Sequence, residues 1–96
     1  MRPKIERHIC ASSYARHSFF KPNGVPVSEL LKIKIDRDEF EAVRLVDIEG
    51  LSQQDAATKM QVSRQTFANI LKRSRFKITT ALIEGNALVL PEKLLD

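Results

Sequence analysis

The stretch VSRQTF, residues 62–67, decides the fold prediction. Its serine is a preferred helix N-cap, and residues 64–84 contain neither glycine nor proline. Gly85 follows, with Asn86 beside it, and both residue types are typical of a helix end. An apolar row has the spacing of one helix face, at Phe67, Ile70 or Leu71, Ser74, Ile78 and Leu82. We therefore predict a helix over residues 64–84 whose first turn carries Arg, Gln and Thr, side chains that hydrogen-bond well to bases and phosphates.

A second, shorter helix is predicted immediately upstream. Ser52 is its N-cap, and residues 53–60 form its body. Ala57 is a small residue where two helices would approach closely, and Met60 and Val62 would pack into the core on either side of the turn. Gln61 stands at the turn position that prefers glycine because the backbone there often adopts a positive φ, so we expect either a turn strained by roughly 1 kcal/mol or a turn of different shape. A short helix, a three-residue turn and a capped second helix together form a helix-turn-helix pattern.

The outward face of the longer helix has the chemistry of a DNA-reading surface. Arg suits bidentate contact with guanine, and Gln and Asn suit adenine, so we predict base reading by Arg64, Gln65 and Asn69. Short hydroxyl side chains near helix starts and cations farther along suit phosphates. The predicted DNA-backbone set is Ser52, Ser63, Thr66, Lys72, Arg73, Arg75 and Lys77. The outward position of Lys72 would also suit contact with a base.

The chain before residue 53 contains one further predicted helix. Asp36 followed by Glu39 resembles a capping box, and Gly50 ends the segment, so a helix is predicted over residues 37–49. One of its apolar rows contains Phe40, Val43 and Val46. The other contains Ala42, Leu45 and Ile48.

Short strands are predicted near residues 5–10, 31–35 and 87–90, where apolar residues alternate with others or form short bounded runs. Residues 21–24, Lys-Pro-Asn-Gly, have the chemistry of a β-turn. The predicted organisation is a basic N-terminal segment, residues 1–35, followed by a helix-turn-helix domain, residues 36–96. The predicted fold class is mainly α, with a tri-helical core and short N- and C-terminal β-strands.

Charge is sorted along the chain. Residues 1–35 carry 7 basic and 2 acidic groups, residues 36–60 carry 3 and 7, and residues 61–96 carry 6 and 3. Five basic residues and no acidic one fall between positions 61 and 77. Such a concentrated positive face favours a polyanionic partner, although a solvated helix face would have the same composition.

Several segments also resemble a known family. DEFEAVRL at 38–45, EGLSQ at 49–53, AA at 56–57 and VSRQTF at 62–67 are similar to a family of small prokaryotic predicted DNA-binding proteins of unknown function. FKPNGVP at 20–26 and ALIEG at 81–85 match that family too. More distantly, residues 36–82 resemble region four of bacterial sigma factors, which has a similar helix-turn-helix. The resemblance implies double-stranded DNA as partner and transcriptional regulation.

Other functions are compatible with parts of this sequence. A tri-helical fold also serves as a protein-interaction module, for example one that docks on RNA polymerase or another regulator. The acidic residues around position 38, namely Asp36, Asp38, Glu39 and Glu41, are better explained as caps and dipole partners than as a nuclease metal site. His8, Cys10 and His17 lack paired ligand spacing. We therefore predict no enzyme activity, no metal and no cofactor.

Location and assembly follow from composition. The single cysteine, Cys10, excludes an intrachain disulfide and favours a reducing, cytoplasmic setting, and no apolar run is long enough to span a membrane. Tyr14, Phe19 and Phe20 lie in a segment too short to bury them alone. One helix-turn-helix also reads few base pairs, so a homodimer that reads two half-sites is expected.

Overall fold

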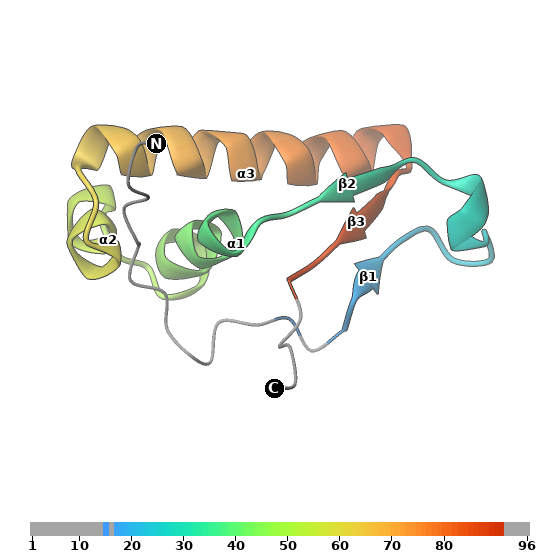
Figure 1. Ribbon diagram of the computed structural model, residues 1–96, viewed down its shortest axis with the longest axis horizontal. Coiled ribbons are helices and arrows are strands. Elements are labelled where there is room, and N and C mark those ends of the chain that lie inside the picture. Colours follow the sequence, from blue (N-terminus) through green and yellow to red (C-terminus); the bar gives the residue numbers. More distant parts are fainter. Residues whose placement is uncertain (1–14, 16, 92–96) are drawn as a thin grey trace, which may run out of the picture.

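The computed structural model describes residue 15 and residues 17–91 (Figure 1). The helical elements are η1 (Val27–Glu29), α1 (Arg37–Val43), η2 (Arg44–Ile48), α2 (Gln53–Met60) and α3 (Arg64–Glu84). The strands are β1 (Phe19–Phe20), β2 (Lys32–Lys34) and β3 (Ala87–Val89). The fold is mainly helical with short strands on both sides of the helices, as predicted. The strand predicted near residues 5–10 lies outside the described residues.

Three helical segments enclose the core. Phe67 of α3 is fully buried at its centre and packs among α1, η2 and α2. The buried apolar cluster consists of Ala42, Leu45, Ala56, Ala57, Met60, Phe67, Ile70 and Leu71. Val62 packs against this cluster, so the predicted core roles of Ala57, Met60 and Val62 are confirmed. Burial of this shared apolar surface holds α2 and the first half of α3 in one rigid unit.

Local signals set the ends of α2 and α3. Ser52 Oγ accepts a hydrogen bond from the Asp55 N–H at 3.0 Å, and Ser63 Oγ accepts one from the Thr66 N–H at 3.0 Å. Gly85 has φ 71° and closes α3 in the left-handed region that glycine adopts without steric cost. Both helices therefore occupy the residues predicted for them.

The turn between α2 and α3 is tight. Gln61 has φ 58° and ψ 44°, so of the two expected alternatives the structure has the left-handed backbone that is strained for a non-glycine residue. Its N–H donates to the Thr58 carbonyl at 3.1 Å, and the Val62 N–H donates to the Ala57 carbonyl at 3.1 Å. These two bonds form a Schellman helix end, whose typical apolar contact Val62 supplies by packing against the core. The turn thereby fixes the direction in which α3 leaves α2.

The predicted helix over residues 37–49 changes its hydrogen-bond register halfway. From Arg44 to Ile48 the bonding is of the π type, and the Glu49 N–H donates to the Arg44 carbonyl at 3.0 Å. Each π turn holds an extra residue, so the residues after it are rotated relative to a regular α-helix. Ile48, expected on the buried row with Ala42 and Leu45, is consequently 80% exposed.

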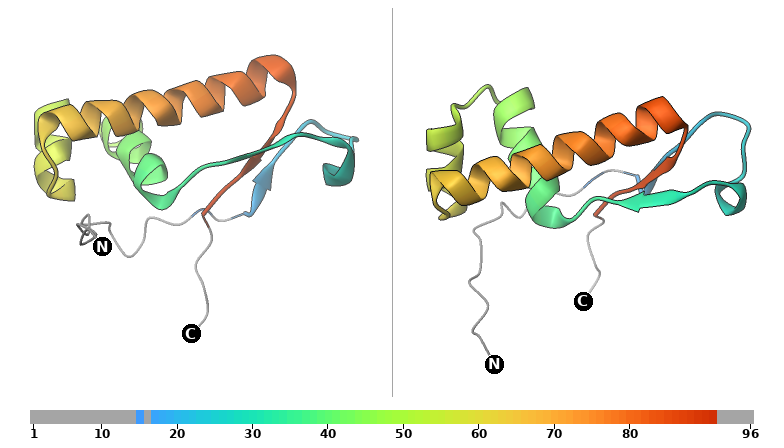
Figure 2. Two further views of the ribbon diagram at one scale, coloured as in Figure 1. Left: turned by 45° about the horizontal axis from the view of Figure 1, so that its top comes forward. Right: turned by 90° about the horizontal axis from the view of Figure 1, so that it is seen from above.

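The strands form one small sheet in the order β1-β3-β2. β1 pairs antiparallel with β3, and β2 pairs parallel with β3. Figure 2 shows that the C-terminal half of α3 passes over this sheet, while α2 lies beneath the other end of α3. β1 was not predicted, and the turn that follows it centres on Asn23 and Gly24, one residue later than expected, with Gly24 at φ 81°.

The buried row of α3 also differs from the prediction near its end. Ala81, at 4% exposure, is buried, whereas Leu82 is 75% exposed. Ala81 is small enough for α3 to approach Leu88 of β3 closely, and both residues line the same hollow at the sheet. From the apolar row in the sequence we expected the larger Leu82, the next residue along the helix, to occupy this buried position.

Candidate nucleic-acid interface

The start of α3 presents a polar face built by its cap. The Ser63 hydroxyl accepts from the Thr66 N–H and donates to Thr66 Oγ1 at 2.9 Å, so both hydroxyls are oriented at the first turn. The remaining N–H groups of this turn and the helix dipole leave a partial positive charge there. The arrangement suits contact with an anionic group, provided that other cations lie nearby.

The predicted base-reading residues share this end of the helix. Arg64, Gln65 and Asn69 are exposed, and Gln65 Nε2 lies 3.4 Å from Asn69 Oδ1 in a weak hydrogen bond. Positions 65, 69 and 72 repeat at i, i+4 and i+7, so these three side chains occupy one face opposite Phe67 and Ile70. We name Arg64, Gln65, Asn69 and Lys72 the reading face.

Within the described part of the chain, the cations of the reading face contact no acidic side chain. Among the described residues, the side chains of Arg64 and Lys72 form no hydrogen bond or ion pair with the chain. Lys59 of α2 is also exposed. Ser52, at the start of α2, uses its hydroxyl oxygen as the cap acceptor and keeps its hydroxyl hydrogen as a donor.

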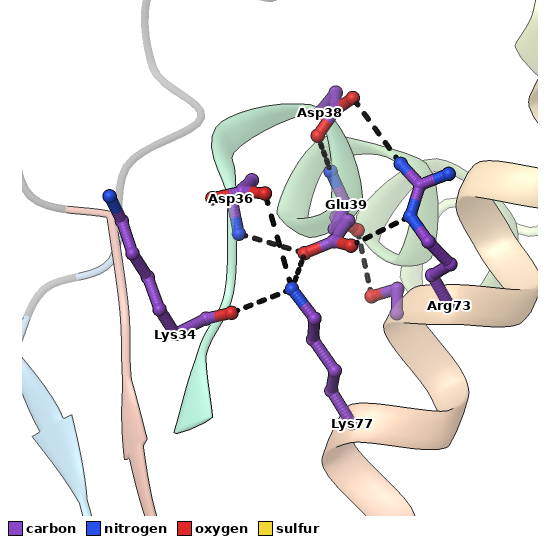
Figure 3. A network of polar contacts seen from close by, with 7 residues as sticks. Lys34, Asp36, Asp38, Glu39, Arg73 and Lys77 are labelled. Carbon is purple, nitrogen blue, oxygen red and sulfur yellow. Dashed lines mark hydrogen bonds and ion pairs between the residues drawn. The ribbon is translucent and has the colours of Figure 1, made fainter. Parts of the chain in front are cut away.

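The cations farther along α3 are arranged differently. Arg73 and Lys77 turn toward α1, and both bind the carboxylate of Glu39, which is 1% exposed (Figure 3). Arg73 Nε lies 3.1 Å from Glu39 Oε2, and Lys77 Nζ lies 2.7 Å from Glu39 Oε1. On the other flank, Arg75 Nη2 lies 2.7 Å from Asp47 Oδ1 of η2. These three predicted phosphate contacts are thus engaged by carboxylates within the chain.

Glu39 is the centre of this network. Its Oε1 also accepts from the Asp36 N–H at 2.9 Å, the half of the capping box that glutamate contributes, and its backbone carbonyl accepts from Ser74 Oγ at 2.9 Å. Burial raises the pKa of Glu39, but hydrogen bonds from Lys77, from the Asp36 N–H and from Arg73 outweigh burial and lower it overall. Glu39 is therefore a buried anion that ties α1 to α3.

Charge pairing stabilises the ionised form of two arginines as well. A hydrogen bond to Glu41 raises the pKa of Arg44, and a hydrogen bond to Asp47 raises the pKa of Arg75. The cap and dipole interpretation of the acidic set is confirmed at the start of α1, where Asp36 and Glu39 form the predicted capping box and Asp38 accepts from the Glu39 N–H at 2.8 Å. That interpretation did not include the second role of Glu39, whose buried carboxylate joins α1 to α3. The only sequence signal was Ser74 on the apolar row of α3, because a buried hydroxyl needs a partner.

Within the described part of the chain, no group of three or more His, Cys, Asp and Glu side chains is placed to hold a metal ion. His8 and Cys10 lie outside the described residues, and His17 is exposed. In the described residues, no helix combines the length and apolar character required to cross a membrane.

Comparison with known proteins gives a family without an assigned role. Residues 1–93 match the family described as "Protein of unknown function DUF134". A UPF0251 protein of Vibrio parahaemolyticus is 55% identical over 92 residues, which cover 96% of this chain and 94% of the relative. UPF0251 proteins of Aeromonas salmonicida and Shewanella halifaxensis are each 53% identical, over 93% and 94% of this chain and 85% and 92% of the relatives. No solved structure matches. Across almost its whole length, the chain belongs to this family of bacterial proteins of unknown function.

Proposed function

We propose that the protein binds double-stranded DNA through α2 and α3 and acts as a transcriptional regulator, not as an enzyme. The observation that carries the proposal is the reading face. It lies at the capped start of a helix that a tight turn fixes against a shorter helix, the arrangement by which a helix-turn-helix enters the major groove. The cations Arg64 and Lys72 on that face have no carboxylate partner among the described residues.

The side chains divide into two roles. Arg64, Gln65 and Asn69 read base edges, and the Gln65–Asn69 hydrogen bond aligns two amides that both suit adenine. Lys72, Ser52, Ser63 and Thr66 contact phosphates on either side of the groove. Arg73, Arg75 and Lys77 contribute less than their charge suggests, because a phosphate would have to displace Glu39 or Asp47.

The experiment begins with selection of bound fragments from sheared genomic DNA, which yields the preferred site. Affinity for this site and for an unrelated duplex is then measured for single alanine variants. Arg64→Ala and Gln65→Ala should each cost about 1–3 kcal/mol on the preferred site and little on the unrelated duplex. Lys72→Ala should weaken both and lower the salt slope by about one unit.

Arg75→Ala is the matched control, since it removes the same charge from the same helix but from an intrachain pair. It should leave the salt slope nearly unchanged. If every duplex binds equally weakly and Arg64→Ala has no effect, the sequence-specific proposal is wrong.

The alternative is a module that docks on RNA polymerase or another regulator. One observation favours it: Phe76, 71% exposed, and Ile83, 78% exposed, continue the outward row of α3 beyond Lys72. A protein partner lost on Phe76→Ser, together with equal weak binding to all duplexes, would support this alternative.

A further inference from the structure

Exposed apolar side chains gather at one end of the molecule. Among the described residues, the large apolar side chains with high exposure are Phe19, Phe20, Leu31, Ile48, Phe76, Leu82 and Ile83. All except Ile48 belong to the sheet, its connections or the C-terminal half of α3, the end opposite α2 (Figure 2). Phe76 and Ile83 lie on the outward row of α3, whereas Phe20 and Leu82 line a hollow beside β1. The reading face contributes none. An apolar end beside a polar end indicates a surface that another chain covers.

A hollow deepens this surface beside β1. It lies between β1 and the end of α3, and its apolar lining includes Phe20, Pro22, Leu82 and Leu88. Phe20 is 63% exposed and Leu82 is 75% exposed, so both apolar side chains protrude beside the hollow, whose lining also includes Lys21 and Asn86. The surface thus combines protruding and recessed apolar groups, as a self-complementary contact requires.

β1 also has an open backbone edge. The Leu90 N–H donates to the Ser18 carbonyl at 2.8 Å, and Phe19 lies opposite Val89. In an antiparallel ladder this pattern makes Phe19 a non-hydrogen-bonded position, so its N–H and C=O point away from β3. Within the described residues no other strand lies on that side, because β1 is the last strand of the sheet.

The opposite edge of the sheet is closed. Lys32 and Lys34 are exposed on β2, and the outward carbonyl of Lys34 accepts a hydrogen bond from Lys77 Nζ at 2.8 Å. Charged side chains of this kind block strand addition at natural sheet edges. β1 has two phenylalanines and no charge. The contrast singles out β1 as the edge that accepts a strand.

We propose that a second copy of this chain docks at β1, with the two β1 strands antiparallel across a two-fold axis. Phe19 would then lie opposite Phe19 of the other copy, where main-chain bonds and an aromatic pair are both available. Because β1 carries no charged residue, the two strands do not repel each other. Phe20 of each copy covers the hollow beside β1. The six strands form one continuous sheet.

The two-fold symmetry of this dimer is compatible with the proposed DNA binding. Only the arrangement of the dimer on DNA rests on the proposed function. A two-fold axis perpendicular to the sheet keeps both α3 helices on the same face of the joined sheet. Each reading face lies on the side of α3 opposite its buried row, and therefore both face the same direction. One duplex could then contact both copies at two half-sites.

The test uses the full chain without DNA. Sedimentation equilibrium at micromolar concentration should give the mass of two chains for the wild type and of one chain for Phe19→Glu, because like charges face each other at the axis. Ile48→Glu is the control, since it adds the same charge at an exposed apolar residue outside this surface, and it should remain a dimer. Circular dichroism would show that each variant is folded.

Charge complementation makes the test specific to the two-fold axis. Phe19→Lys alone should also be monomeric, whereas an equimolar mixture of Phe19→Glu and Phe19→Lys should recover the mass of two chains. A monomeric wild type, a dimeric Phe19→Glu or a mixture that stays monomeric would overturn the proposal. A dimer that binds no duplex would overturn the proposed function and leave this inference standing.

Discussion

At the scale of single residues, Gln61 carries a measurable conformational cost. It is the one non-glycine residue with positive φ in the described chain. Gln61→Gly should raise the free energy of unfolding by about 1 kcal/mol, because glycine adopts this conformation without a Cβ clash. Urea denaturation measures the change. Gln54→Gly, within the same helix pair but at regular helical φ, should lower stability by about 1 kcal/mol.

Glu39 is the second residue with a specific expected effect. Glu39→Gln should lower the free energy of unfolding by about 2–3 kcal/mol, since it leaves Arg73 and Lys77 without their buried anion; the partial exposure of both cations reduces the loss below that of a fully buried pair. Glu49→Gln removes an exposed carboxylate that also binds an arginine, and it should cost under about 1 kcal/mol.

The same carboxylate makes stability depend on pH. The folded pKa of Glu39 is lowered, so its contribution is fully present above the unfolded pKa of about 4.5 and is lost as pH falls through the folded pKa. Thermal unfolding of the wild type between pH 6 and pH 3 should therefore show a steeper loss of stability than Glu39→Gln. Parallel curves for the two proteins would show that another group dominates.

At the scale of elements, the π turn of η2 can be tested by substitution. Ile48→Ser should change the free energy of unfolding by less than about 0.5 kcal/mol because Ile48 is exposed, whereas Leu45→Ala should cost about 2–4 kcal/mol. In a regular α-helix both residues would lie on the same row as Ala42, and both substitutions would be costly. Equal losses would contradict the register observed here.

The helices show how far local sequence determines structure. Two helices begin at the N-caps Ser52 and Ser63, and α3 ends at Gly85. Each of these signals acts through contacts within a few residues, so the limits of α2 and α3 could be predicted. The partners of Glu39 lie 34 and 38 residues away, and nothing local indicates them. β1 was missed for the same reason, since two phenylalanines become a strand only because β3 lies beside them.

The reading face shows the corresponding limit for function. The outward positions of Arg64, Gln65, Asn69 and Lys72 followed from helical periodicity alone. The intrachain pairing of Arg73, Arg75 and Lys77 did not, because their carboxylate partners come from α1 and η2. A charge count along one helix therefore overestimates the cations available to a ligand.

At the scale of the whole molecule, the two proposed surfaces lie at opposite ends of α3, a helix about 30 Å long at 1.5 Å per residue. Substitutions at one end should leave the other unchanged. Arg64→Ala should keep the mass of the wild type in sedimentation, while Phe19→Glu should keep weak contact with a single half-site. Loss of dimer mass in Arg64→Ala would show that the two ends are coupled.

The exposure of the reading face also affects how such proteins can diverge. Side chains with few intrachain contacts can be exchanged at little cost in stability, usually within about 0.5 kcal/mol. Mutation can therefore sample new combinations at positions 64, 65 and 69 without passing through unfolded intermediates, while Glu39 and its partners hold the scaffold constant. Under the proposed function, a duplicated copy could acquire a new target by these few changes alone.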